Sequence, residues 1–586
     1  MKKWLDLPIT RRQAIKIIGQ GGLYTFILTQ SPGCVSFQPK GSAAFPSVSD
    51  PLTNPEGLCF SPFNRTLGDK APREFGGDRP DVPHDFFLFK SAAERRELAD
   101  SIRDIEKARV VVVGAGIAGI TAAYELRSYK PVLLDQGPRF GGNAQGEAWR
   151  GTDYSTAAAY FCGQDADSPI LKFYQEIGID KIWRTKKEED PVLLKGKRYT
   201  NFWNGETAPE AAEQFLKLRK YFEDVNGENE GQIYPEIPPA DEKVLQRLKQ
   251  LDQMTFRRHL EEVLGSKLHP HIETALEHYC WSTFACTLDQ MSAAGGMNAY
   301  AAEFGDIYVM PGGNGAIAEA ALRKMTETVP LSHFRPSALV FDVQVKGEGV
   351  LVSYMDHKGK PVRIQAETAI LGCPKFVVKK ILRDIEPERL RALEQLNYNA
   401  YLVANVLVDQ PFGGDEFYDY YLLGDGTVDS ADMEKATDEQ GITDVIYGSY
   451  ARPDRTAAGR PGHTVLTLYR GFPYTEGRGN LYRDGAFEKY YSQFERQIKE
   501  EVLPQLKLDR SKIVDIRISR WGHPMPVQTP GLIRDGIIDS LRRPFRGSVF
   551  FVQQDNWMYA AIETSIQEGL IWAKEAKGKL AGSKVQ

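Results

Sequence analysis

The sequence predicts an α/β fold, and three stretches carry that prediction. The first is the run from Arg109 to Asn143, which opens with four consecutive valines. A short, wholly β-branched run is typical of a strand buried on both faces of a parallel sheet. The other two are the apolar runs 366–374 and 547–552, which predict further strands.

A glycine-rich turn follows the valine strand directly. Gly114 permits the tight turn, Gly116 allows a pyrophosphate to approach the backbone closely, and Gly119 allows the next helix to pack on the strand. That helix is predicted over 117–128, with its N-terminal N–H groups directed at the phosphates. A second strand, 131–135, ends in Asp135 about 20 residues after Gly114, where a ribose-binding carboxylate belongs. The order strand, turn, helix, strand and acid predicts a Rossmann-type dinucleotide site.

The residues after Asp135 indicate which dinucleotide binds. Arg139-Phe140-Gly141-Gly142 resembles the R-x-G-G motif of the flavin-containing amine oxidase and phytoene desaturase superfamily, whose members use it to extend the pyrophosphate site of FAD. The resemblance implies FAD as the cofactor. It is expected to bind without a covalent link, because the closing segment 547–573 holds no cysteine for a thioether. Asn143 stands where the family often has arginine, and Asp135 where it usually has glutamate.

Two later segments also resemble elements of that superfamily. Met310 to Glu319 is similar to the P-G-G element that leads back into the nucleotide domain, and Gln554-Asp555 with the helix 560–573 is similar to the element that closes it. A valine of the strand 338–343 is implied to hold the adenine through backbone groups. The residues that the motifs and the resemblance together assign to FAD are Gly114, Gly116, Ile117, Ala118, Gly119, Asp135, Gln136, Arg139, Gly141, Gly142, Asn143, Val340, Asp555 and Ile562.

The expected organisation is a discontinuous Rossmann-type FAD-binding domain with an α+β substrate or cap domain. The FAD-binding domain is predicted over 109–165, 305–380 and 545–580, and the substrate domain over 166–304 and 381–544. Phe215, Leu218 and Phe222 recur at helical spacing in the inserted part. Residues 45–108 are predicted to form an arm with a leading helix over 92–107, which begins with the capping box of Ser91 and Glu94.

Residues 1–44 are predicted to be a twin-arginine signal peptide. Arg11 and Arg12 precede a modestly apolar stretch that glycines interrupt, which is too short for a comfortable membrane span. The alternative is a basic N-terminal helix. The signal predicts export of the folded, FAD-loaded protein to the periplasm through the twin-arginine machinery. Cys34 lies in a loose lipoprotein box, which leaves lipid anchoring open.

Composition excludes several other classes. The 586 residues carry a formal net charge of −5 without a basic cluster, which argues against nucleic acid as a partner. No Cys or His spacing indicates a metal site. Six cysteines are too few for a disulfide scaffold, and Cys280 and Cys286 are either a pair or two buried thiols.

The expected reaction is removal of hydride from a C–N or C–C bond of a small organic substrate. Many amine oxidases of the resembled superfamily place a lysine beneath the flavin, where it is associated with oxygen reactivity, and Val403 occupies that position here. An apolar floor favours a dehydrogenase that passes electrons to a quinone or another acceptor. His523 and Lys375 are weak catalytic candidates.

Two other functions remain open at this point. The first is a desaturase or isomerase that acts on an apolar substrate. The second is a flavin-binding protein that has lost redox activity and serves in assembly of the cell envelope. The sequence names neither the substrate nor the electron acceptor.

Overall fold

A computed structural model describes residues 52–64, 68–186, 189–414, 417–428, 441–452, 459–473 and 477–582. The predicted signal peptide and Cys34 lie outside these residues. No helix in the described ranges has the length and apolar character that crossing a membrane requires.

The predicted nucleotide-binding sheet is present and confirms the α/β, Rossmann-type fold class. Its strand order is β12-β4-β3-β15-β14-β13, and β21 pairs with β15 on the side away from β3. β3, β4, β12 and β21 run parallel to their neighbours, whereas β13 and β14 form an antiparallel meander with β15. The strands are β3 (Ile105–Val113), β4 (Val132–Leu134), β12 (Phe334–Arg335), β13 (Leu339–Lys346), β14 (Gly349–Met355), β15 (Pro361–Leu371) and β21 (Val549–Phe551).

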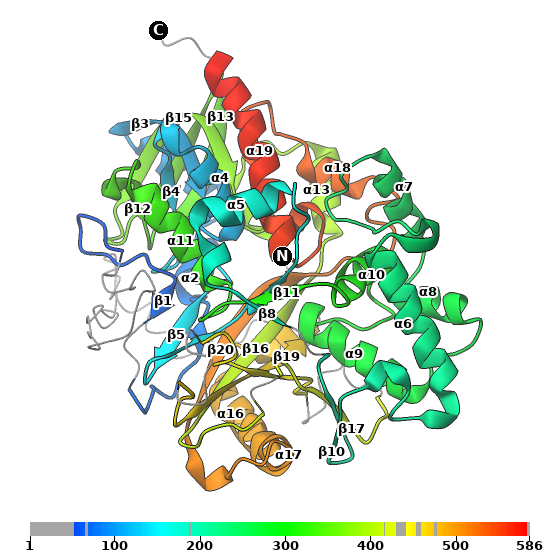
Figure 1. Ribbon diagram of the computed structural model, residues 1–586. Coiled ribbons are helices and arrows are strands. Elements are labelled where there is room, and N and C mark those ends of the chain that lie inside the picture. Colours follow the sequence, from blue (N-terminus) through cyan, green and yellow to red (C-terminus); the bar gives the residue numbers. More distant parts are fainter. Residues whose placement is uncertain are drawn as a thin grey trace.

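The four valines of β3 are buried on both faces of the sheet, as predicted. Val110 and Val112 pack in one apolar cluster with the helices of one face, and Val111 and Val113 pack in another with β13, β14 and α12. Figure 1 shows the helices of the first face grouped beside the sheet. The helices next to the sheet are α4 (Ile117–Glu125), α5 (Pro169–Ile177), α11 (Gly315–Thr326), α12 (Lys375–Ile381) and α19 (Ile562–Gly582).

A second sheet, called the floor sheet below, carries the substrate side of the molecule. Its order is β18-β19-β16-β20-β2, and every residue of its central strand β16 is buried. The strands are β2 (Gly76–Gly77), β16 (Tyr398–Val408), β18 (Val445–Tyr447), β19 (Thr464–Phe472) and β20 (Ile513–Pro526). Helix α16 (Ala486–Gln497) and a π-helical turn (Ile498–Val502) cover its outer side.

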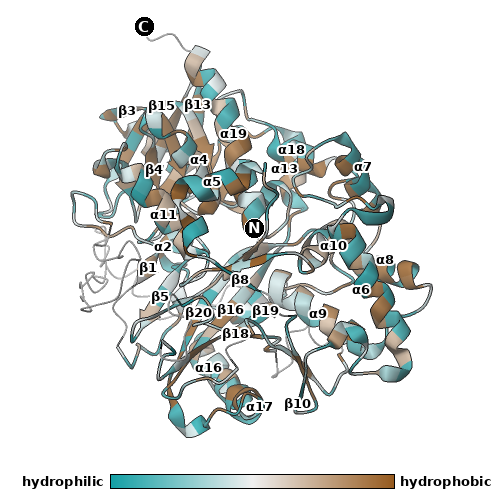
Figure 2. Ribbon diagram, in the orientation of Figure 1, coloured by the Kyte–Doolittle hydropathy of each residue, from teal (hydrophilic) through white to brown (hydrophobic). Residues whose placement is uncertain are grey.

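The insertion between the nucleotide-binding segments is largely helical, as expected. Phe215, Leu218 and Phe222 are buried on one face of α6, whose other face is polar (Figure 2), and further helices pack around them. These helices are α6 (Ala212–Asn226), α7 (Glu242–Leu251), α8 (Phe256–Leu264), α9 (Pro270–Phe284) and α10 (Ala293–Ala302), joined by α13 (Pro387–Glu394) and α18 (Ile537–Arg542).

Short strands connect these parts in three small sheets. Their orders are β1-β5-β6, β10-β9-β17 and β7-β11-β8. The strands are β1 (Phe63–Asn64), β5 (Gly146–Trp149), β6 (Thr152–Ser155), β7 (Tyr160–Cys162), β8 (Arg184–Lys186), β9 (Val192–Leu194), β10 (Lys197–Tyr199), β11 (Ile307–Val309) and β17 (Tyr421–Gly424).

The N-terminal arm, residues 52–64 and 68–101, joins the two halves of the molecule. Near its start, Phe60 stacks on Phe334 with ring centroids 4.7 Å apart, and β1 pairs with β5. Farther on, β2 extends the floor sheet beside β20, and Asp78 accepts the N–H of Gly522 at 2.8 Å. Helices α2 (Asp81–Phe89) and α3 (Ala92–Ser101) then return to the nucleotide-binding side.

Several local predictions are settled by these elements. The capping box of Ser91 and Glu94 is present, but α3 ends at Ser101 because Ile102 is extended and β3 already begins at Ile105. Cys280 and Cys286 form no disulfide and are two buried thiols. The closing helix begins at Ile562, two residues later than expected, and continues to Gly582.

Candidate functional site: a dinucleotide cavity

One cavity of about 2240 Å³ extends from the nucleotide-binding sheet to the floor sheet. Drug-sized ligands occupy cavities of roughly 300–1000 Å³, so this one has room for a dinucleotide and a further small molecule. Every residue assigned to FAD from the sequence lines it except Gly119. Gly119 acts in packing, since a Cβ there would lie 2.0 Å from the Gly114 carbonyl oxygen.

The glycine turn brings the N-terminus of α4 to the cavity. Gly114 needs its glycine because its φ is +90° and a Cβ would lie 2.8 Å from Cys373 N. Gly116 is different: its backbone is extended, and a Cβ would meet only the Gly142 Cα, at 3.8 Å. No side chain caps α4, so the first-turn N–H groups are available to an anion in the cavity.

The Arg139–Gly142 loop lies directly against this turn. Gly116 and Gly141 form a parallel β-bridge, and the Gly141 N–H donates to the Ala115 carbonyl oxygen at 2.7 Å. Gly141 and Gly142 both have positive φ, at +108° and +59°. The two phosphate-binding elements predicted from the sequence therefore form one continuous surface, with Arg139 among the cavity-lining residues.

Asp135 lies at the end of β4 and receives two backbone N–H groups. Ala115 and Gly137 each donate to one of its carboxylate oxygens at 2.7 Å. Burial raises the pKa of this carboxyl to about 6, and the two N–H groups oppose that rise. Each oxygen retains a lone pair for a ribose hydroxyl.

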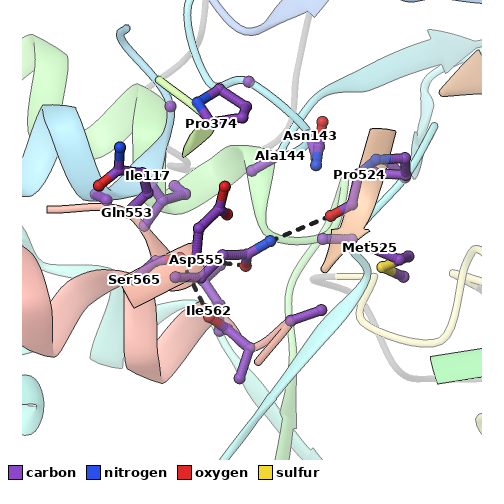
Figure 3. A pocket seen from close by; sticks show the side chains of 18 of the residues that line it. Ile117, Asn143, Ala144, Pro374, Pro524, Met525, Gln553, Asp555, Ile562 and Ser565 are labelled. Atoms are coloured by element: carbon purple, nitrogen blue, oxygen red, sulfur yellow. Dashed lines mark hydrogen bonds between the residues drawn. The ribbon is translucent and has the colours of Figure 1, made fainter. Parts of the chain in front are cut away.

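The opposite end of the cavity is enclosed by segments far apart in the sequence. Side chains of Asn143, Pro524, Gln553, Asp555 and Ile562 converge there (Figure 3). The Gln554 side-chain amide donates to the Pro524 carbonyl oxygen at 3.2 Å, which ties β20 to the segment after β21. The oxygen Oε1 of buried Gln553 has no hydrogen-bond partner in the described chain.

Asp555 is buried and already bonded within the protein. Its Oδ2 accepts the Tyr398 hydroxyl at 2.6 Å and the Lys375 backbone N–H at 2.9 Å. Burial raises its pKa, and these donors oppose the rise. A second oxygen remains for a ligand hydroxyl.

The two catalytic candidates lie in different surroundings. Lys375 does not line the cavity: its Nζ donates to the Leu541 carbonyl oxygen at 2.8 Å, and burial lowers its pKa well below the usual value. It therefore cannot replace a lysine on the floor sheet. His523 does line the cavity, with its ring 4.4 Å from that of Phe376. Burial, followed by the charge of Arg478, lowers its pKa well below the usual value, so it is neutral.

Val403 lies in β16, the central strand of the floor sheet. Val403 is buried in β16, lines the cavity and is paired with Tyr469 on one side and Ser519 on the other. Within the described residues, the cavity-lining lysines are Lys379 and Lys380 of α12, which is not part of the floor sheet.

Sequence reasoning missed an acidic wall of the same cavity. Glu303, Asp419 and Asp444 line it, and all three come from loops between elements that are distant in sequence. An isolated acid in a loop is usually solvated, so the sequence held no signal for this wall before its elements were brought together.

Comparison with known proteins agrees with this geometry. Residues 112–177 match the NAD(P)-binding Rossmann-like domain family. The chain is 23% identical over 530 residues to oxidoreductase PigB of Serratia sp. (strain ATCC 39006), covering 80% of this chain and 75% of that protein.

Solved structures show the same fold at low sequence identity. Putrescine oxidase bound to putrescine superposes with a TM-score of 0.59 at 13% identity, covering 81% of this chain and 100% of that one. Cyclohexylamine oxidase from Brevibacterium oxydans IH-35A gives 0.57 at 14%, covering 81% and 99%. A fatty acid isomerase from P. acnes gives 0.56 at 13%, covering 80% and 98%.

The fold of this chain is therefore the one that these solved amine oxidases and the fatty acid isomerase share, built around a Rossmann-like nucleotide-binding domain.

Proposed function

We propose that the protein is an FAD-dependent dehydrogenase that oxidises a C–N or C–C bond of a small organic substrate and passes the electrons to a quinone or another acceptor. FAD, bound without a covalent link, would supply the hydride acceptor. The residues present fit it: the uncapped α4 N-terminus and Arg139 would hold the pyrophosphate, Asp135 would bind the ribose, and the backbone at Val340 would bind the adenine.

The single observation that carries the choice of dehydrogenase is the apolar floor at Val403. A buried valine provides neither a charge nor a water site at this point of the cavity. The chain itself would exclude water and orient the substrate between the floor sheet and the α19 N-terminus, because the cofactor supplies the redox chemistry. His523 is neutral and suits a packing or hydrogen-bonding role better than that of a cation.

An isomerase of an apolar substrate is the second candidate. It is favoured by the same valine and by the shared fold with the fatty acid isomerase. In that case the hydride would return to another carbon of the substrate, and no external acceptor would be needed.

Anaerobic bleaching of the purified flavoprotein tests these candidates. A panel of amines, amino acids and unsaturated lipids is mixed with it, and the flavin absorbance and the products are followed. A dehydrogenase is expected to bleach with one substrate class and to recover with a quinone. Product isomers without net bleaching would indicate the isomerase, and a bound flavin that no substrate reduces would contradict both proposals and favour the redox-inactive assembly protein.

We also propose that residues 1–44 direct export of the folded protein to the periplasm. The support is the Arg11-Arg12 pair ahead of an apolar, glycine-interrupted stretch. Export in the folded state suits a protein whose proposed FAD site is assembled from segments far apart in the sequence.

A further inference from the structure

Behind the acidic wall of Glu303, Asp419 and Asp444, Lys186 and Asp190 complete a cluster of four carboxyl groups and one ammonium group. Lys186 Nζ lies 2.6 Å from Asp190 Oδ2 and 3.5 Å from Glu303 Oε2. The Asp419 backbone N–H donates to Asp190 Oδ1 at 3.3 Å, and Asp444 lies beside Asp419 at the start of β18. The side chains of Lys186, Asp190 and Glu303 are no more than 13% exposed, and Asp419 and Asp444 are 4% and 2% exposed.

The charges of this wall do not balance if every carboxyl group is ionised. Lys186 is committed to Asp190 and Glu303, which raise its pKa against the effect of burial. Glu303 also accepts the hydroxyls of Tyr160 at 2.8 Å and Tyr279 at 3.2 Å. Asp419 and Asp444 are left to share the remaining low-dielectric space, where two adjacent anions repel each other.

The surroundings favour one proton on the Asp419–Asp444 pair. Burial raises the pKa of Asp444 to about 7, opposed by hydrogen bonds from Ser282 and Thr443. Burial, followed by the charges of Asp444 and Asp190, raises the pKa of Asp419 well above its usual value. The other ionisable groups facing the pair are Lys186 and Asp190 from the β8–β9 side, Glu303 after α10, Tyr401 of β16, Tyr418 and Tyr421 at β17, and Tyr469 of β19.

Tyr418 supplies an independent observation that a polar atom belongs in this cluster. Its side chain is 3% exposed, and its hydroxyl has no hydrogen-bond partner in the described part of the chain. The charges of Asp419, Asp190 and Asp444 all act on that hydroxyl. A buried hydroxyl is rarely left without a partner, so this one has capacity for a hydrogen bond to a water within the cluster.

The strand register connects this wall to the floor at Val403. Val445 pairs with Leu468, which places Asp444 opposite Tyr469, and Tyr469 pairs with Val403. Asp444 and Val403 are thus two strands apart, or roughly 10 Å at the usual spacing. A small substrate lying on Val403 reaches the acidic pair.

We propose that the Asp419–Asp444 pair is the proton acceptor of the dehydrogenation proposed above, on which this inference rests. For an amine substrate, the N–H bond would break and its proton would pass to an ionised carboxylate of the pair, while the hydride of the C–H bond would leave for the bound FAD. The substrate would gain a C=N bond and lose two electrons, which the hydride carries. Lys186 stabilises the negative charges of Asp190 and Glu303, so that the exchangeable proton resides on Asp419 and Asp444.

Infrared spectroscopy of the resting, oxidised flavoprotein tests, without turnover, whether the Asp419–Asp444 pair holds one proton. The wild-type protein is expected to show a buried carboxylic-acid C=O band that shifts in D₂O and disappears as the pH rises through about 7. Asp444→Asn and Asp419→Asn should each abolish that titration. Asp425→Asn is the matched control, because Asp425 is exposed just after β17 and lies outside the cavity.

A milder variant covers the case in which both asparagine substitutions fail to fold. Thr443→Val removes the hydroxyl that donates to Asp444 Oδ1 at 3.0 Å, and it should move the midpoint of the titration upward. An unchanged band and midpoint in Asp444→Asn or in Thr443→Val would overturn the proposal.

Kinetics provide the second readout once a substrate is known. Anaerobic flavin reduction should rise with pH through the same midpoint in the wild type, and it should fall about 10²- to 10⁴-fold and lose this pH dependence in the two asparagine variants. If no substrate reduces the flavin, the proposed function is wrong. The infrared titration then still measures whether Asp419 and Asp444 share a proton. An unchanged pH–rate profile in Asp444→Asn contradicts the proton acceptor alone.

Discussion

Gly116→Ala should separate folding from cofactor binding. Gly116 has φ −75° and ψ 178°, which any residue adopts, and an added Cβ would make one ordinary contact at 3.8 Å with Gly142 Cα. Loss of a glycine N-cap and reduced entropy of the unfolded chain act in opposite directions, so stability should change by no more than about 1 kcal/mol.

The same methyl group occupies the surface on which the pyrophosphate would lie. Displacing the phosphate from two charge-assisted N–H bonds of α4, at about 1.5–3 kcal/mol each, would cost about 3–6 kcal/mol of binding. That corresponds to a loss of about two to four decades in affinity for FAD.

Calorimetric titration of deflavinated protein with FAD, alongside thermal unfolding of the same samples, measures both effects. Gly119→Ala is the control, since its Cβ would lie 2.0 Å from the Gly114 carbonyl oxygen and must displace the backbone. Stability and binding should fall together in that control. A Gly116→Ala protein that binds FAD as the wild type does would refute the assignment of the glycine turn to the pyrophosphate.

Three further variants test other parts of the argument. Val403→Lys should accelerate reoxidation of the chemically reduced flavin by oxygen, measured by stopped-flow absorbance, while an unchanged slow rate would count against the apolar-floor explanation. Asp135→Asn should flatten the pH dependence of stability in the flavin-free protein. The folded pKa of Asp135 is about 6, above the usual 3.8, so its contribution to wild-type stability is full below about pH 4 and declines by up to about 3 kcal/mol as the pH rises to about 6. Denaturant titrations at several pH values that give the same change of stability with pH in both proteins would contradict this prediction. Replacing Arg11 and Arg12 together by lysine should retain the precursor, with FAD bound, in the cytoplasm. Cell fractionation measures this retention, and normal export of the variant would favour the basic-helix alternative.

The parts of the fold that were predictable are those that local chemistry specifies. The valines of β3, the glycine turn and the capping box of α3 each depend on neighbours within a few residues, and all three are present. The cavity-lining residues of the glycine turn were predictable for the same reason, because the turn depends on glycines at fixed spacing.

The acidic wall and the arm depend instead on tertiary arrangement. Lys186, Glu303, Asp419 and Asp444 come from four separate places in the chain, and no spacing rule links them. β2 is two glycines long and pairs with Ser519 and Arg520, so it has no periodicity to detect. Lys375 was a catalytic candidate from its place after a predicted strand, but the structure excludes it from the cavity. Its ammonium group is directed at the Leu541 carbonyl oxygen.

The arm and the last strand pair with segments that lie far away in the sequence, so these pairings form late in folding. β21, near the end of the printed sequence, pairs with β15 in the nucleotide-binding sheet, and β2, near the beginning of the described chain, pairs with β20. During synthesis the glycine turn leaves the ribosome hundreds of residues before these partners exist. Such non-local pairing slows folding and leaves apolar strands exposed in the meantime. The cavity that β3 and the glycine turn begin to form is therefore complete only after nearly all of the printed sequence has been synthesised.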